Sequence, residues 1–164
     1  MPDELQRLEH AYANAMWNWS EAENHLFTIY AIACNVAMSE WEPIRHAFFA
    51  VTSGHARLDM INAAAKEKWM HSPHLANWND LYKECKEQTK KRGAIAHLVG
   101  SVFTSNKSEP AIVRLTQPMW RPDFPGSYEK AKVEGYSIEV LLTLGHDWEV
   151  LGVKIRDFYR QIAF

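Results

Sequence analysis

Apolar residues in the first part of the chain alternate between spacings of three and four. The series consists of Leu5, Leu8, Tyr12, Ala15, Trp19, Ala22, Leu26, Ile29 and Ala33. This spacing places the side chains in one stripe along a helix, where they can pack against a core. No glycine precedes Gly54 to interrupt the series. The pattern therefore predicts a long first helix.

Two further helical segments precede Pro73. Ser39 and Glu42 have the spacing of a capping box, and Pro43 suits the first turn of a helix. Gly54 interrupts this second helix. A third helix is predicted by the stripe of Leu58, Ile61, Ala65 and Trp69.

The fourth stripe begins after Pro73 and includes a charged residue. Its members are Leu75, Trp78, Tyr82, Cys85, Thr89, Arg92, Ala96 and Val99. Gly100 suits the position just beyond the last residue of a helix, so this pattern predicts that the fourth helix ends there.

Residues 101–136 differ in character from the helical segments. They contain Pro110, Pro118, Pro122 and Pro125, and the stretch AIVRLT from Ala111 to Thr116 alternates like a short strand. The last stripe is helical again, with Leu141, Leu144, Trp148, Leu151, Ile155, Phe158 and Ile162. Gly145 and Gly152 lie one heptad apart on it, which favours close approach of a neighbouring helix.

These elements predict an all-α fold. We expect an antiparallel up-and-down bundle of four to five helices, with a loop or short β excursion at about 101–136. A chain of 164 residues fits one core, and no internal repeat divides it. A single helical domain over residues 1–164 is therefore predicted.

The composition narrows the possible functions. The net charge is −2, so no global positive field attracts nucleic acid, and any anion must bind at a local patch. No apolar run approaches the roughly 18 residues of a membrane span, and no signal peptide opens the chain. We expect a cytoplasmic protein without membrane contact, in which Cys34 and Cys85 are buried thiols in a reducing compartment.

Arg92 is the unusual member of the fourth stripe. A guanidinium on a core-facing stripe needs an anion or access to water, because an unpaired buried charge is costly. One interpretation is an ion pair within the chain, for example with Glu23, or an arginine at the edge of the stripe whose charge reaches water. The other is a groove where Arg92 binds an anion from outside.

His97 follows Arg92 by five positions, about 140° around an ideal helix. Arginine's length, or a loosened turn at Gly93, would be needed to bring both side chains to one ligand. Four lysines precede the arginine: Lys83, Lys86, Lys90 and Lys91. They suit a solvated face with local ion pairs, although Lys90, Lys91 and Arg92 form the densest cationic spot in the chain.

The motif Arg92-x4-His97, within KKRGAIAHLVG late in a predicted helix, resembles the signature of the HEPN superfamily. Members carry an arginine, four to six residues and then a histidine, on a domain of long antiparallel helices. The resemblance covers most of the chain and leaves residues 101–136 as an insert. Active members usually have a polar residue after the arginine, commonly asparagine, whereas this chain has Gly93.

The resemblance implies a metal-independent endoribonuclease of toxin or defence type that needs no cofactor. Two copies of the motif would face one cleft in a homodimer. Arg92 would stabilise the phosphate, His97 would move protons, and Lys86, Lys90 and Lys91 would hold the RNA. An antitoxin or a nucleotidyltransferase-like protein is the implied partner. Other members have lost catalysis, so the alternative is a noncatalytic module that binds a nucleotide or a protein.

Other candidate sites have ordinary structural explanations. Glu21 and His25, like Glu42 and His46, are four apart, which suits helix pairs and not the Glu-x-x-His spacing of di-iron bundles. His71 and His74 flank Pro73 without a nearby cluster of metal ligands. Six tryptophans lie at or beside the stripes and are expected in the core: Trp17, Trp19, Trp41, Trp69, Trp78 and Trp148. Trp120, among prolines, is a candidate partner contact.

Overall fold

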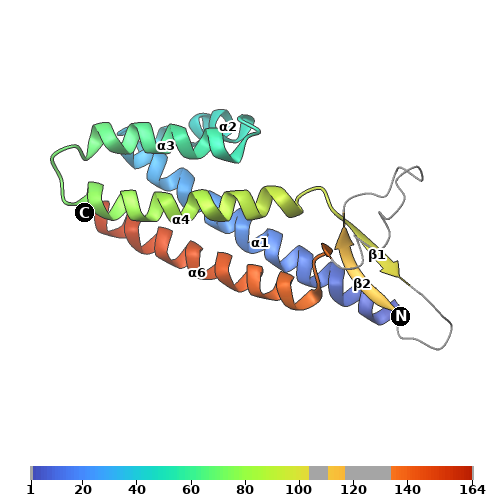
Figure 1. Ribbon diagram of the computed structural model, residues 1–164. Helices are drawn as coiled ribbons and strands as arrows, with labels where there is room; N and C mark the ends of the chain where they lie inside the picture. Colours follow the sequence, from blue (N-terminus) through green and yellow to red (C-terminus); the bar gives the residue numbers. More distant parts are fainter. Residues whose placement is uncertain (1, 104–110, 117–133, 164) are drawn as a thin grey trace. The chain divides into compact units, whose positions relative to one another are not determined.

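The computed structural model describes residues 2–103, 111–116 and 134–163, and these residues are mostly helical (Figure 1). The elements are α1 (Pro2–Ala33), a short 3-10 helix (Met38–Glu40), α2 (Trp41–Ala50), α3 (Gly54–Lys68), α4 (His74–Ile95), β1 (Val99–Phe103), β2 (Ile112–Thr116) and α6 (Ile138–Ile162). The prediction of a helical protein with a short β excursion is confirmed at this level.

The chain forms two compact units. Unit 1 contains Met1–Asn18 and Arg92–Asp147, and unit 2 contains Trp19–Lys91 and Trp148–Phe164. Three helices, α1, α4 and α6, contribute residues to both units.

Unit 2 has a core of large aromatic side chains. Trp19 and Trp148 are buried and meet edge to face, with ring centroids 5.5 Å apart. Within this unit α4 and α6 are antiparallel, because Trp78 packs against Phe158 whereas Gln88 bonds to Trp148 at the other end. Burial of these rings removes a large apolar area from water, which is the main stabilising contribution to such a core.

Unit 1 combines the first half of α1 with the two-stranded sheet. The strands β1 and β2 are antiparallel, with Val99 opposite Thr116 and Phe103 opposite Ile112. Leu115 also exchanges two backbone hydrogen bonds of 2.9 Å with Tyr136. Val113 and Leu115 are buried on one face of the sheet, whereas Phe103, which lies opposite Ile112, is buried on the other face.

The two glycines of α6 allow close contact with α1, as the sequence predicts. In unit 1, a Cβ placed on Gly145 would lie 3.4 Å from Ala15 Cα; in unit 2, one on Gly152 would lie 3.9 Å from Ala22 Cα. Within unit 2, α1 and α6 run parallel, because Trp19 meets Trp148, Ala22 lies near Gly152 and His25 meets Tyr159. Larger side chains at these positions would push the backbones apart.

The predicted end of α4 is wrong. The helix ends at Ile95, and Gly100 lies in β1 instead of following the helix. Val99 already belongs to the strand ladder, and it is 43% exposed, whereas Ile95 is fully buried. The absence of a side chain at Gly100 allows Leu5 to lie close to β1, because a Cβ at this position would be 3.0 Å from Leu5 Cδ1.

Three smaller expectations are also corrected. Ser39 lies in the 3-10 helix and does not cap α2, whose N-cap Glu40 makes no side-chain capping bond. Trp17 is 66% exposed and not in the core. Cys34 is exposed, and only Cys85 of the two cysteines is buried. None of the helices in the described residues has the length and apolar character required to cross a membrane.

Candidate functional site

The last turn of α4 carries Arg92 in unit 1. The side chain is half-buried, and its Nε atom is buried without a hydrogen-bond partner. Among residues 2–103, 111–116 and 134–163, no carboxylate pairs with it. A buried donor that lacks an acceptor costs free energy, so this guanidinium has unused capacity for an anion.

His97 lies in the turn that joins α4 to β1, also in unit 1 (Figure 1). The turn is held by bonds from Leu98 N to Ile95 O (3.2 Å) and from Tyr12 Oη to Ala96 O (3.5 Å). His97 itself is exposed. Because α4 ends two residues earlier, the 140° separation of an ideal helix does not describe the relation between His97 and Arg92.

Gly93 directly follows Arg92 in the sequence. It lies within α4, and a Cβ built on it would meet no atom within 4 Å. A larger side chain therefore fits there without displacing anything. The glycine is not required by close packing at this point.

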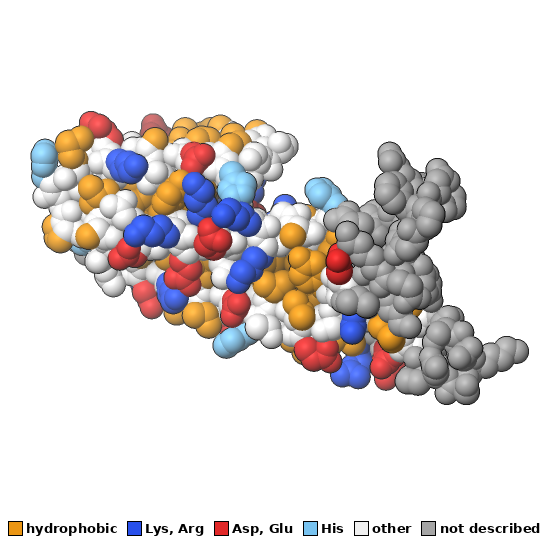
Figure 2. Space-filling view, viewed as in Figure 1, with side chains coloured by type: hydrophobic (Ala, Val, Ile, Leu, Met, Phe, Trp, Pro, Cys, Tyr) orange, Lys and Arg blue, Asp and Glu red, His pale blue; other side chains and the backbone are white. Residues whose placement is uncertain are grey.

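The three predicted RNA-binding lysines belong to unit 2 and are exposed on α4. Lys86 Nζ lies 5.8 Å from the centre of the Tyr82 ring, and Lys90 Nζ lies 2.9 Å from Glu87 Oε1. The hydrogen bond from Lys90 lowers the pKa of Glu87. On the face drawn in Figure 2, cationic and acidic side chains are interspersed. Local pairing therefore occupies part of this basic run.

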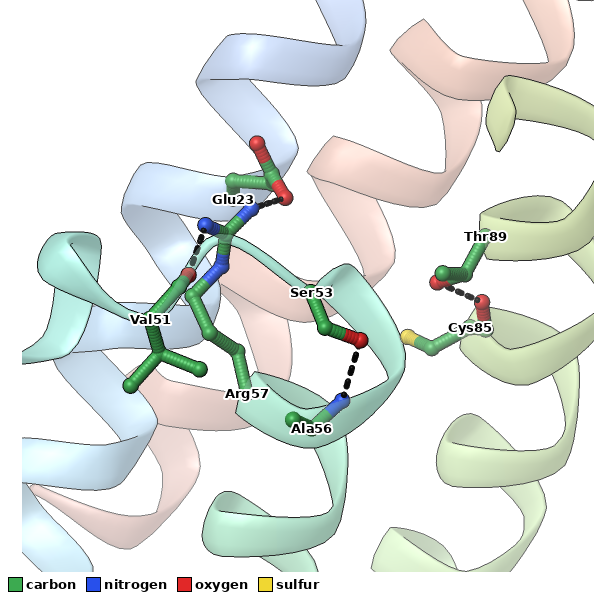
Figure 3. A network of polar contacts seen from close by, with 7 residues as sticks. All are labelled: Glu23, Val51, Ser53, Ala56, Arg57, Cys85 and Thr89. Carbon is green, nitrogen blue, oxygen red and sulfur yellow. Dashed lines mark hydrogen bonds and ion pairs between the residues drawn. The ribbon is translucent and has the colours of Figure 1, made fainter.

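A second polar site lies in unit 2, where Arg57 of α3 forms an ion pair with Glu23 of α1 (Figure 3). Arg57 Nη1 also donates to Val51 O at 2.8 Å, and the guanidinium lies over the rings of Phe48 and Phe49. Glu23, one example of an acid that could have paired with Arg92, pairs with Arg57 instead.

The pairing of Glu23 with Arg57 was not predicted, although the sequence contains a signal for it. Glu23 is four residues after Trp19, and Arg57 is four residues before Ile61. Both charges thus flank buried stripes, as Arg92 does. Two opposite charges that flank core stripes on different helices are candidates for a mutual ion pair.

A small cavity adjoins this ion pair within unit 2. Its lining includes Trp19, Glu23, Arg57 and Thr89, and its volume of about 10 Å³ is near the lower limit for one water molecule. Trp19 Nε1 is buried without a hydrogen-bond partner. This space is too small for a substrate, so we assign the network a structural role.

The remaining candidates give no metal site in the described part of the chain. No three His, Cys, Asp or Glu side chains gather there as potential metal ligands. His46 and Glu42 form the expected helix pair at 3.5 Å. Trp120 lies outside the described residues.

No protein-family model, curated protein or solved structure significantly matches the chain.

Proposed function

We propose that the chain is a metal-independent endoribonuclease of the HEPN type, with Arg92 and His97 at its active site. The proposal is carried by the Arg92 guanidinium, which is half-buried at the end of α4 with an unpaired Nε. The pairing that would have made this arginine structural is taken by Arg57. No acid among the residues that the structure describes pairs with Arg92, which favours an anion from outside as its partner.

The chemistry suits these two residue types. RNA can be cleaved without a metal when its 2′-hydroxyl attacks the adjacent phosphorus and the 5′-oxygen leaves. The fixed charge of Arg92 would stabilise the negative charge that develops on the phosphate oxygens. His97 is exposed, and histidine is the side chain that most often serves as a general acid or base.

The quaternary arrangement is part of the proposal. In a homodimer with both motifs at one cleft, one His97 would accept the proton of the 2′-hydroxyl and its symmetry mate would protonate the leaving oxygen. The antiparallel up-and-down bundle, expected from the helical pattern, and an antitoxin or nucleotidyltransferase-like partner, implied by the resemblance, belong to the same proposal.

The test is an RNA cleavage assay in excess EDTA with the purified full chain. We expect single-stranded RNA to be cut to products with cyclic phosphate ends. His97→Ala should lower the rate by roughly 100-fold or more, as loss of a general acid–base does. The control is His71→Ala, which removes another exposed histidine and should leave the rate unchanged. Normal cleavage by a folded His97→Ala variant would refute the proposal.

The second candidate is a noncatalytic module that binds a nucleotide through Arg92, and Gly93 favours it. Because position 93 has open space, Gly93→Asn tests the difference. If the chain is a nuclease, the asparagine should preserve or raise the cleavage rate. If neither wild type nor Gly93→Asn cuts RNA but Arg92→Gln weakens nucleotide binding, the noncatalytic module is correct.

A further inference from the structure

A group of cationic and aromatic side chains lies at α1 and α6 of unit 2, apart from the residues assigned above. Arg156 and Arg160 are four residues apart on α6 and therefore share a face of the helix. Tyr159 lies between them in sequence, and its ring centre is 5.6 Å from that of His25 on α1. We call His25, Arg156, Tyr159 and Arg160 the α1–α6 basic cluster.

The two guanidiniums of this cluster have unused hydrogen-bonding capacity. Arg156 Nε is buried and has no hydrogen-bond partner. Asp157 forms a salt bridge with Arg156, but its Oδ1 is 3.8 Å from Nε, too far for a hydrogen bond. Arg160 forms no ion pair with any residue in the described parts of the chain. Arg160 is therefore available to a ligand, and Arg156 has a donor that its partly exposed ion pair does not use.

The pKa of His25 reflects the charges of the neighbouring residues. Its pKa is lowered, first because it is partly buried; the charge of Glu21 raises it, and the positive charges of Arg156 and Arg160 lower it, each by less than Glu21 raises it. The positive charges of both arginines therefore reach the imidazole. A cation at the end of a helix is often explained by the helix dipole, and Arg160 lies in the last turn of α6. This explanation does not extend to Arg156, which lies one turn earlier.

We propose that the α1–α6 basic cluster binds a phosphate group, with the Arg156 and Arg160 guanidiniums as the main contacts and His25 as a further donor. Planar guanidiniums match the oxygens of a tetrahedral anion, and their charge-assisted hydrogen bonds are among the stronger ones in proteins. The group would belong either to a small phosphate monoester or to the phosphodiester backbone of RNA. The site shares no residue with the proposed catalytic pair, so either proposal can fail without the other.

Binding is measured by NMR titration of the His25 ring signals in the full chain, with inorganic phosphate as the probe. We expect saturable shifts at His25. Arg156→Gln and Arg160→Gln should each weaken binding by about fivefold, which corresponds to the loss of one exposed charge pair. The control is the double variant Lys66→Gln/Lys83→Gln, which removes two exposed charges from α3 and α4 and should bind like wild type.

The pH dependence gives a second readout that a purely structural role would not change. Sulfate keeps its charge between pH 5 and 8, so it isolates the titration of His25. A bound anion favours the imidazolium and raises the pKa of His25; by linkage, sulfate should bind more tightly as the pH falls through this range. Glu21 also faces His25. His25→Gln should remove most of this pH dependence.

The source of the phosphate group is distinguished by comparing inorganic phosphate with dimethyl phosphate, a model of the diester. Tighter binding of inorganic phosphate indicates a monoester ligand, and equal binding indicates an RNA backbone. The proposal is overturned if neither probe shifts the His25 signals, or if the arginine variants bind as tightly as the control.

Discussion

Arg57 in unit 2 and Arg92 in unit 1 are similar in sequence context but different in structure. Each flanks a stripe of buried residues on its helix. The Arg57 side chain is 12% exposed and is satisfied by Glu23, by Val51 O and by two aromatic rings. Arg92 is half-buried, and its Nε has no partner.

The difference arises from residues elsewhere in the chain. Glu23 is 34 residues away from Arg57 in sequence and is brought to it by the packing of α1 and α3. No corresponding acid in the described residues reaches Arg92. Both helices thus carry a charged residue beside a stripe of buried residues. The fold determines whether that residue forms an internal ion pair or remains available to a ligand.

The largest expected effect is on stability when the Arg57 pair is broken. Glu23→Gln keeps the size of the side chain but leaves a largely buried guanidinium without its counter-charge. We expect the free energy of unfolding to fall by about 3 kcal/mol, measured by urea denaturation. Glu84→Gln breaks the more exposed pair with Lys154 and should cost less than about 1 kcal/mol. Equal losses of stability in the two variants would show that the buried ion pair contributes no more than the exposed one.

The thiol of Cys85, which neighbours the same polar network (Figure 3), should make stability depend on alkaline pH. Burial raises its pKa from the usual 9.0 to about 12. Above pH 9 the unfolded chain loses this proton and the folded chain keeps it, so stability falls as the pH rises toward 12. The slope from this group is roughly 1 kcal/mol per pH unit.

Unfolding measured between pH 8 and 11 tests this contribution against two variants. Cys85→Ala should show a shallower decline than wild type. Cys34→Ala, which removes the exposed thiol, should keep the wild-type slope. Parallel curves for all three proteins would show that burial of Cys85 does not affect its ionisation.

Substitution of the glycines near the two arginines should change the free energy of unfolding by a smaller amount. Gly93→Ala adds a methyl group in open space within α4 and should raise the free energy of unfolding by about 0.5–1 kcal/mol. Gly54→Ala would place its methyl group 3.1 Å from the Thr89 methyl and should stabilise less or destabilise. Thermal unfolding of both variants gives the comparison, and a larger gain at Gly54 would contradict it.

The smallest expected effect on stability is that of Arg92→Leu. No ion pair is lost, so the free energy of unfolding should change by less than about 1 kcal/mol. Arg57→Leu leaves Glu23 unpaired and should cost about 3 kcal/mol. A similarly large loss for Arg92→Leu in urea denaturation would identify Arg92 as structural and remove the basis of the proposed active site.

The helices could be predicted because their signal is local. The stripe from Leu141 to Phe158 is buried as its spacing predicts, and Gly145 and Gly152 lie against small residues of α1. The spacing could not reveal that α4 ends at Ile95, since helical periodicity continues to Val99. There the hydrogen bonds that pair β1 with β2 replace those that would have extended the helix.

The candidate site was predicted only as a set of residues. The sequence suggested Arg92 and His97 as candidates, but it did not show that Glu23, one possible partner of Arg92, pairs with Arg57. The exposure of Trp17 and Cys34 was missed for a similar reason. A stripe indicates which side of a helix is apolar, whereas the neighbouring elements decide which positions they cover.

By itself, therefore, the sequence determined which segments are helical, which faces are apolar and which residue types are available for chemistry, because these depend on neighbours three or four positions away. Only the tertiary structure decided that Arg57 is neutralised while Arg92 is not. Charge pairing and burial depend on atoms that approach in space from distant parts of the chain, and no spacing along the chain specifies them.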